Sequence, residues 1–158
     1  MGKVIADATV ISNYVLIKRL DLLQKVVANL CTTREVFEEL RFGVERGIFP
    51  ASDLGQIEVL EMNSEERKVF SKLADTLGRG ESSCIAIALT RGFKMLTDDL
   101  DARKYAQRFG VPVSGTIGVL VLAVNGKIIS KEQGNRLLSE MIRMGFYSSI
   151  ESLDEILT

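Results

Sequence analysis

The sequence predicts an α/β protein, a three-layer α/β/α arrangement around a mainly parallel central sheet of about four to five strands. Short apolar runs typical of strands alternate along the 158 residues with longer segments whose apolar residues recur at helical spacing. The segments between successive strands are too long for hairpins, so the strands should run parallel, with helices on both faces of the sheet. The length is typical of a single domain, which we expect to span residues 1–158.

The N-terminal half is expected to alternate three strands with helices. Its first strand is a short apolar run that ends at Asp7. The apolar residues that come directly after Asp7 recur at helical spacing. In chain order, the expected elements are a strand at 3–6, helices at 8–20 and 22–27, a strand at 30–31, a helix at 33–47, a strand at 57–62 and a helix at 64–77.

The C-terminal half is expected to add two strands and several helices. The helix that begins at Glu81 is apolar almost all round at residues 84–89, which predicts that it is buried against a sheet face. In chain order, the expected elements are a helix at 81–92, a strand at 94–97, a helix at 101–110, a strand at 111–113, a helix at 116–124 and helix throughout 130–151.

Several polar residues mark where these helices should begin. Asp21 can cap the second helical run, Thr32 with Glu35 has capping-box spacing, and Ser130 with Gln133 has it again near the C-terminus. These signals place the helix starts within the alternating pattern.

Composition excludes several function classes. Twenty Lys and Arg against 21 Asp and Glu give a net charge of −1, so the chain lacks the basic surplus of an electrostatic nucleic-acid or membrane binder. The absence of histidine excludes Ser/His and Cys/His nucleophile pairs and His-ligated zinc. Cys31 and Cys84 form no CxxC pair, and the longest apolar run, 117–124, is too short to span a membrane. We therefore expect a cytoplasmic protein without a membrane association.

Four acidic residues lie where the predicted fold would form a ligand-binding or catalytic site. Asp7, Asp98 and Asp99 close strands, and Glu81 opens the buried helix after a glycine-rich break. Each acid taken alone is equally well explained as a helix cap or a solvated charge. Together they converge on the carboxyl edge of one sheet, where like charges repel unless a cation lies between them. An all-oxygen ligand set favours Mg²⁺ or Mn²⁺ and indicates phosphate chemistry.

Five segments resemble the PIN domain, in the order and spacing of that family, from one end of the chain to the other. They are VIADATVI at 4–11, VFEEL at 36–40, GRGESSCIAIALTRG at 78–92, MLTDDLDARKYAQRFGV at 95–111 and SGTIGVL at 114–120. The resemblance is strongest to the prokaryotic subgroup related to toxins of toxin–antitoxin pairs.

The resemblance implies a metal-dependent ribonuclease acting on single-stranded RNA, with Asp7, Glu39, Glu81 and Asp99 as its catalytic acids. The implied metal ligands are Asp7, Glu81 and Asp99, with Asp98 as an additional or alternate ligand. Related proteins often carry Asp where Glu81 stands here. The resemblance also implies a small antitoxin as a possible partner and a homodimer, for which the apolar stretches 117–124 and 141–146 provide surface.

Helix geometry supports Glu39 among the neighbouring acids. The apolar residues of its helix define a buried face, and Glu39 lies nearer to the edge of that face than Glu35 or Glu38. Glu35 has a role in the capping box, and Glu38 is expected to face solvent.

Other polar residues near the acids have two possible roles. Thr9, Asn13 and Thr116 could position substrate or water, although helix capping by Thr116 and Ser114 also explains the hydroxyls. Five basic residues could contact phosphates if the fold gathers them, and otherwise belong to the solvated surface: Arg79, Arg91, Arg103, Lys104 and Arg108.

Two other enzyme classes begin with a strand-ending Asp and do not match. Phosphatases of the haloacid-dehalogenase type need a second Asp at the position of Thr9, and receiver domains need an adjacent acidic pair after the first strand. A non-catalytic PIN-like module that binds RNA or protein stays open as the alternative.

Overall fold

A computed structural model describes residues 2–157, so the outermost residues of the expected domain lie outside the described part. Within that range five short strands form one parallel sheet in the order β3-β2-β1-β4-β5. The strands are Val4–Ala6 (β1), Leu30–Thr33 (β2), Glu58–Leu60 (β3), Lys94–Leu96 (β4) and Val113–Ser114 (β5). The predicted α/β class and the parallel sheet are therefore confirmed.

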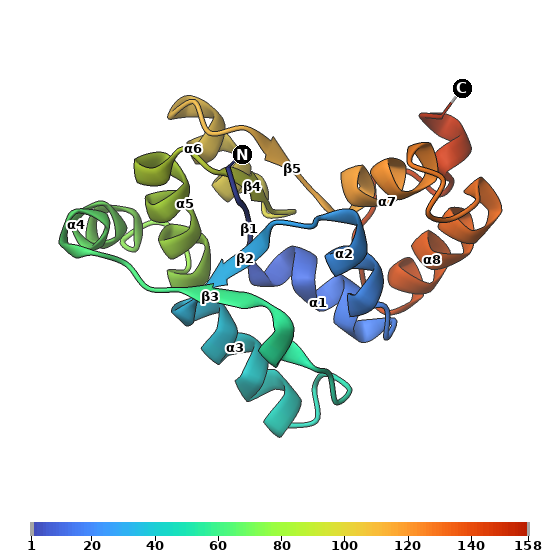
Figure 1. The fold of residues 1–158 in the computed structure, drawn as a ribbon, viewed down its shortest axis with the longest axis horizontal. Helices are drawn as coiled ribbons and strands as arrows, with labels where there is room; N and C mark the ends of the chain where they lie inside the picture. Colours follow the sequence, from blue (N-terminus) through green and yellow to red (C-terminus); the bar gives the residue numbers. More distant parts are fainter. Residues whose placement is uncertain (1, 158) are drawn as a thin grey trace.

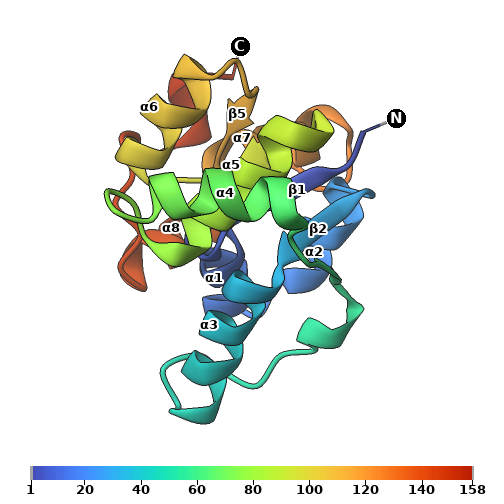
Figure 2. The same cartoon turned by 90° about the vertical axis from the view of Figure 1, so that its left-hand side faces the viewer.

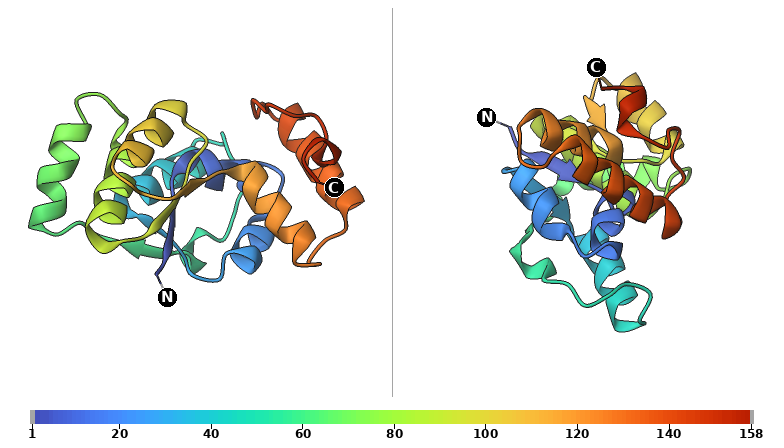
Figure 3. Two further views of the ribbon diagram at one scale, coloured as in Figure 1. Left: turned by 90° about the horizontal axis from the view of Figure 1, so that it is seen from above. Right: turned by 90° about the vertical axis from the view of Figure 1, so that its right-hand side faces the viewer.

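Eight α-helices within residues 2–157 surround the sheet and give the three layers (Figure 1). Helices α4 and α5 lie on one side of the strands, and α7 and α8 lie on the other. Figure 2 shows α4 crossing the outer side of α5, and Figure 3 shows α8 outside α7 at the opposite end. The helices are Ala8–Leu16 (α1), Leu20–Val26 (α2), Arg34–Glu45 (α3), Ser64–Leu73 (α4), Arg79–Arg91 (α5), Leu100–Arg108 (α6), Thr116–Asn125 (α7) and Lys131–Arg143 (α8).

The strand order creates a switch point between β1 and β4. From β1 the chain winds through β2 to the edge strand β3, then crosses back through α4 and α5 to reach β4 on the other side of β1. Helices that leave β1 and β4 therefore depart toward opposite faces, and the crevice between their starts is where open α/β sheets bind ligands.

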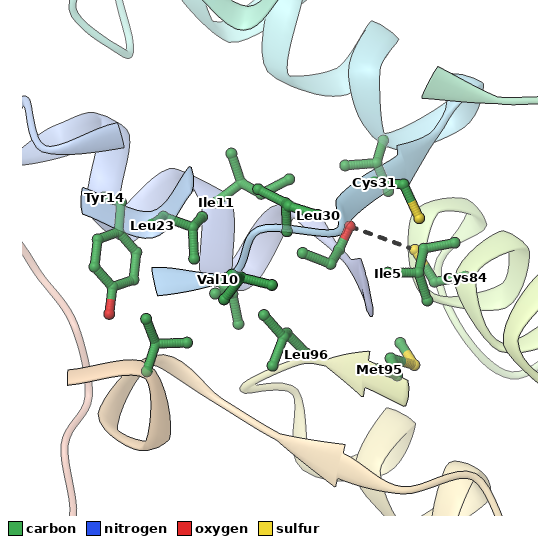
Figure 4. Packing of buried hydrophobic residues seen from close by; sticks show 14 of the residues in the cluster. Ile5, Val10, Ile11, Tyr14, Leu23, Leu30, Cys31, Cys84, Met95 and Leu96 are labelled. Atoms are coloured by element: carbon green, nitrogen blue, oxygen red, sulfur yellow. Dashed lines mark hydrogen bonds between the residues drawn. The ribbon is translucent and has the colours of Figure 1, made fainter. Parts of the chain in front are cut away.

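The core is formed by buried side chains of the central strands, of α5, and of α1, α2, α7 and α8. Ile5, Met95 and Leu96 are buried on these strands, as the near-continuous apolar runs of a parallel sheet require (Figure 4). Helix α5 packs on β1, β2 and β4, which explains why it is buried on nearly all sides. Cys84 Sγ donates to the Ala6 carbonyl oxygen at 3.7 Å, so α5 sits directly on the strand that carries the first acid.

Three helix predictions were wrong in extent. The expected helix 64–77 begins at Ser64 as predicted but ends at Leu73. The expected helix 8–20 ends at Leu16, because Lys18 takes a left-handed conformation with φ of 59°, and α2 then begins without a side-chain cap from Asp21. The expected C-terminal helix begins with the predicted Ser130 capping box but ends at Arg143. Gly145 follows with φ of 111°, which a continuing helix cannot accommodate. Within residues 2–157, no helix is both long enough and apolar enough to cross a bilayer.

Candidate active site at the carboxyl edge of the sheet

Asp7 ends β1 and caps α1, so its carboxylate lies at the carboxyl edge of the sheet beside β4. The side chain is fully buried. Its Oδ1 accepts hydrogen bonds from Thr9 N–H at 3.0 Å, from Val10 N–H at 3.4 Å and from Thr9 Oγ1 at 2.5 Å, and Oδ2 accepts one from Thr97 Oγ1. Burial raises the pKa of Asp7 to about 7; the hydrogen bonds oppose this rise, and the negative charge of Glu81 adds to it. The carboxylate is therefore held in place although its negative charge is poorly stabilised.

Thr97 joins Asp7 to Asp99, a role that the sequence analysis missed. Its buried hydroxyl donates to Asp7 Oδ2 and accepts from the backbone N–H of Asp99 at 3.1 Å. Asp99 Oδ1 accepts from Ala102 N–H at 2.9 Å and so caps α6. Threonine is common in strands, so its presence beside the Asp pair gave no distinct signal.

Asp98 is held by α1 and α7. Its Oδ1 accepts from Thr116 N–H at 2.9 Å, and its Oδ2 accepts from Thr116 Oγ1 at 2.5 Å and Asn13 Nδ2 at 3.2 Å. Its backbone N–H donates to Thr9 Oγ1 at 2.9 Å, which links it to the hydrogen bonds around Asp7. Burial raises the pKa of Asp98, and the bonds from Thr116 oppose that rise. Because Gly115 is the N-cap of α7, Thr116 anchors Asp98 instead of capping this helix as expected.

Glu81 and Glu39 approach the site from α5 and α3. Glu81 lies in the first turn of α5, where the helix dipole favours negative charge. Glu39 is exposed, yet its Oε1 lies close enough to α5 that a Cβ built on Gly80 would be 3.2 Å away. Partial desolvation raises the pKa of Glu39, and the charge of Glu81 raises it further. Glu81 thus interacts electrostatically with Asp7 on one side and with Glu39 on the other.

The donor groups at this edge are oxygens, which suit a hard divalent cation. Residues 2–157 contain no group of three His, Cys, Asp or Glu side chains gathered as a ready metal site. Mg²⁺ commonly takes one or two carboxylates and completes its shell with water and phosphate oxygens. Among the described residues Asp7 Oδ2 has one hydrogen-bond partner, and a carboxylate oxygen can accept another contact. The Asp7–Glu81 pair, in which the charge of Glu81 raises the pKa of Asp7, fits such a cation.

Comparison with known families decides what kind of domain this is. The family model DUF3368, described as a PIN domain, matches residues 3–158. The chain belongs to the PIN domain family. PIN domains are generally metal-dependent nucleases, so the resemblance found in the sequence is confirmed at the level of the family.

A solved structure supports the fold. The crystal structure of PAE2754 from Pyrobaculum aerophilum superposes with a TM-score of 0.55 at 17% sequence identity, covering 78% of this PIN domain and 98% of that chain. Comparison with curated proteins gave no match. At this identity the likeness concerns the arrangement of strands and helices.

Of the five basic residues considered, Arg103 is the one that the described part of this PIN domain places beside the acids. Its Nη1 donates to the Thr97 carbonyl oxygen at 3.0 Å, and its charge partly opposes the rise that burial causes in the pKa of Asp98. The others serve elsewhere or face solvent: Arg91 pairs with buried Glu66, Arg79 lies over Phe70, Arg108 lies over Tyr105, and Lys104 is exposed.

The capping box expected at Thr32 and Glu35 is absent from α3. Thr33 is the cap, and its hydroxyl accepts from Val36 N–H at 3.1 Å, while Thr32 Oγ1 donates to the Ala6 carbonyl oxygen at 2.7 Å. Glu35 lies one helical turn before Glu39, and its Oε1 is buried without a hydrogen-bond partner in residues 2–157. Glu35 is thus another acid of α3 with a partly buried carboxylate, which the sequence analysis had assigned to capping.

Proposed function

We propose that this PIN domain is a metal-dependent endoribonuclease that hydrolyses phosphodiester bonds of single-stranded RNA with Mg²⁺ or Mn²⁺. The observation that carries the proposal is the buried Asp7 carboxylate, whose pKa is raised by burial and by Glu81 at the switch point of the sheet. Strongly perturbed acids in such a crevice are characteristic of functional sites.

Asp7 and Glu81 would hold the cation together with Asp99, whose backbone N–H donates to the same Thr97 hydroxyl that donates to Asp7. When bound, a divalent cation lowers the pKa of water and stabilises the charge that develops on the phosphodiester. Asp98 Oδ2 accepts bonds from Thr116 Oγ1 and Asn13 Nδ2, which fixes α1 against α7, while within residues 2–157 Oδ1 accepts one bond, from Thr116 N–H. Because Oδ1 can accept another contact, Asp98 would serve as an additional or alternate ligand of the cation.

Glu39 and Arg103 would act on the attacking water and on the RNA substrate, respectively. The raised pKa of Glu39 makes its carboxylate a suitable acceptor for the proton of the attacking water. Arg103 uses Nη1 to hold the Thr97 carbonyl oxygen, which leaves its other donors for phosphate oxygens.

The proposal extends to partners and compartment. Leu122 on α7 and Met144 after α8 are exposed apolar side chains that support a homodimer, and Phe42 and Ile48 support docking of a small antitoxin. Two buried free thiols, Cys31 and Cys84, support a reducing, cytoplasmic setting.

The test is cleavage of a labelled single-stranded RNA by purified wild type and by Asp7→Asn, with Mn²⁺, with Mg²⁺ and with EDTA. We expect cleavage only by the wild type and only with a divalent cation. Cleavage that persists in EDTA and in Asp7→Asn would reject the mechanism, and RNA binding without cleavage would favour a non-catalytic PIN module.

A further inference from the structure

A cavity of about 770 Å³ opens next to the acids on the Asp98 side. It shares Thr9, Asn13 and Asp98 with the hydrogen-bond network described above. Its remaining walls come from α6, from the end of β5 and the first turn of α7, and from the segment 145–149 that follows α8. The cavity is therefore continuous with the proposed active site, but Asp7, Glu39, Glu81 and Asp99 do not line it.

The inner wall of the cavity offers fixed polar groups. Arg103 is partly buried and is oriented by its bond to the Thr97 carbonyl oxygen at 3.0 Å. Asn13 donates through Nδ2 to Asp98 and Thr116, which leaves its amide Oδ1 without a partner in the part of the chain that the structure describes. Arg103, Asn13 and the carboxylate of Asp98 thus line the cavity from positions fixed by their other hydrogen bonds.

The outer rim of the cavity is apolar and aromatic. Leu100 is 72% exposed and Tyr147 is 95% exposed, and both line the cavity. Exposed large apolar side chains at the mouth of a pocket commonly contact a ligand.

Tyr147 projects from a backbone that is anchored on both sides. Before it, Phe146 N–H donates to the Met141 carbonyl oxygen at 2.9 Å. After it, Leu153 is fully buried and its N–H donates to Asn135 Oδ1 at 2.7 Å. An exposed ring on a fixed backbone is preorganised for contact, because little backbone entropy is lost on binding.

We propose that this cavity receives one nucleotide of the single-stranded RNA, with its base stacked on Tyr147 and its phosphate bound by Arg103. The inference rests on the proposed function and adds the residues that hold the substrate. An aromatic face, an arginine and an amide oxygen match the base, the phosphate and the polar base edge of a nucleotide. The volume lies within the range of pockets that hold ligands of this size.

The test measures RNA binding in EDTA, where metal-dependent cleavage is blocked. The probe is a single-stranded RNA of about ten nucleotides with one 2-aminopurine, a length within the range that single-strand binding sites cover. Tyr147→Ala should raise Kd about tenfold and abolish the fluorescence change of the base, as loss of one base–aromatic stack does. Tyr147→Phe keeps the ring and should bind as the wild type does. Phe109→Ala is the matched control, because Phe109 is also an exposed aromatic side chain, at 42%, and does not line the cavity.

The outcomes separate this inference from the proposed function. Tyr147-dependent binding by a wild type that never cleaves RNA with Mn²⁺ would support the nucleotide pocket and reject the ribonuclease. Metal-dependent cleavage together with unchanged binding by Tyr147→Ala would support the ribonuclease and overturn the pocket, leaving the cavity to a protein partner. Absence of RNA binding by a folded wild type would also overturn the inference.

Discussion

The carboxylate of Asp7 is fully buried and accepts four hydrogen bonds, and its pKa nevertheless rises to about 7. The hydrogen bonds favour the charged form, so the cost of desolvation exceeds their combined effect. An acid in this situation either binds a proton or requires a cation. The same residue therefore sets both the pH dependence of folding and the metal dependence expected of the site.

In the metal-free protein, the raised pKa of Asp7 makes the free energy of unfolding depend on pH. Between the ordinary value of 3.8 and about 7 the folded state keeps a proton on Asp7 that the unfolded state has lost, so this group's contribution to stability falls as pH rises. We expect Asp7→Asn to match the wild type near about pH 4 and to exceed its free energy of unfolding by a few kcal/mol near about pH 8. Urea unfolding in EDTA measures this difference. A gap that stays constant across that pH range would contradict the raised pKa.

Glu39 and Glu38 offer a matched pair on α3. Glu39 lies against Gly80 and is affected by the charge of Glu81, whereas Glu38 pairs with Arg41 on the solvent side. Glu39→Gln should lower the Mn²⁺-dependent rate of RNA cleavage by about 10²-fold or more, the usual effect of losing a general base, and Glu38→Gln should leave it near the wild-type rate. Equal losses in initial rate, with unchanged folding, would show that α3 does not present Glu39 to the site.

At the scale of elements, apolar periodicity predicted where strands and helices lie better than where the helices begin and end. Thr32 and Thr33 have the same side chain, and only the folded structure distinguishes them: Thr32 bonds to β1, while Thr33 contacts Ser83 on α5 at 2.7 Å. The spacing of Thr32 and Glu35 predicted Thr32 as the cap of α3, because local spacing carries no information on contacts between segments 50 residues apart.

The junction of α4 and α5 includes an ion pair between the buried Glu66 and the partly exposed Arg91. Glu66 is fully buried, and its carboxylate accepts from Arg91 Nε at 2.7 Å and Nη2 at 2.9 Å and from Thr90 Oγ1 at 2.6 Å. The hydrogen bond from Arg91 is the main cause that lowers the pKa of Glu66 to about 2, so the stability that it contributes is lost as pH falls from 4.5 toward that value.

Breaking this pair should destabilise the fold without touching the site. Glu66→Gln weakens the charge-assisted hydrogen bonds from Arg91, whose side chain stays 30% exposed to water, and should cost about 2 kcal/mol. Glu65→Gln, at the exposed neighbouring position, should cost almost nothing. Urea unfolding near neutral pH gives both values. A loss below about 1 kcal/mol for Glu66→Gln would show that the pair contributes little to holding α4 on α5.

At the scale of the whole molecule, the acids were predictable and their connections were not. Asp7, Asp98 and Asp99 follow apolar strands, and parallel strands must present such residues at one edge. Thr97 and the contact between Arg103 and the strand end depend on the separation of β1, β4 and α6, which no local pattern encodes. The strands set the location of the site, and tertiary packing completes its network.

The apolar side chains left exposed on α7 and after α8 predict association of two chains. Leu122 and Met144 remain exposed, although Leu120 and Met141 in the same segments are buried. Light scattering at tens of micromolar protein should therefore give a mass twice the 17.5 kDa of one chain, and Leu122→Ser should shift the population toward the monomer. A monomeric wild type under these conditions would contradict the homodimer.

The central claim is that Asp7 and Glu81 together hold a divalent cation at the carboxyl edge of the sheet. The measurement that tests it most directly is thermal unfolding with EDTA and with Mn²⁺ at constant ionic strength, for wild type, Asp7→Asn, Glu81→Gln and the control Glu38→Gln. A cation that binds only the folded state adds RT ln(1 + [L]/Kd), about 2.7 kcal/mol at 100 times Kd. We predict that Mn²⁺ raises the melting temperature of wild type and Glu38→Gln, and that Asp7→Asn and Glu81→Gln lose most of this gain. An equal rise in all four proteins would contradict the claim.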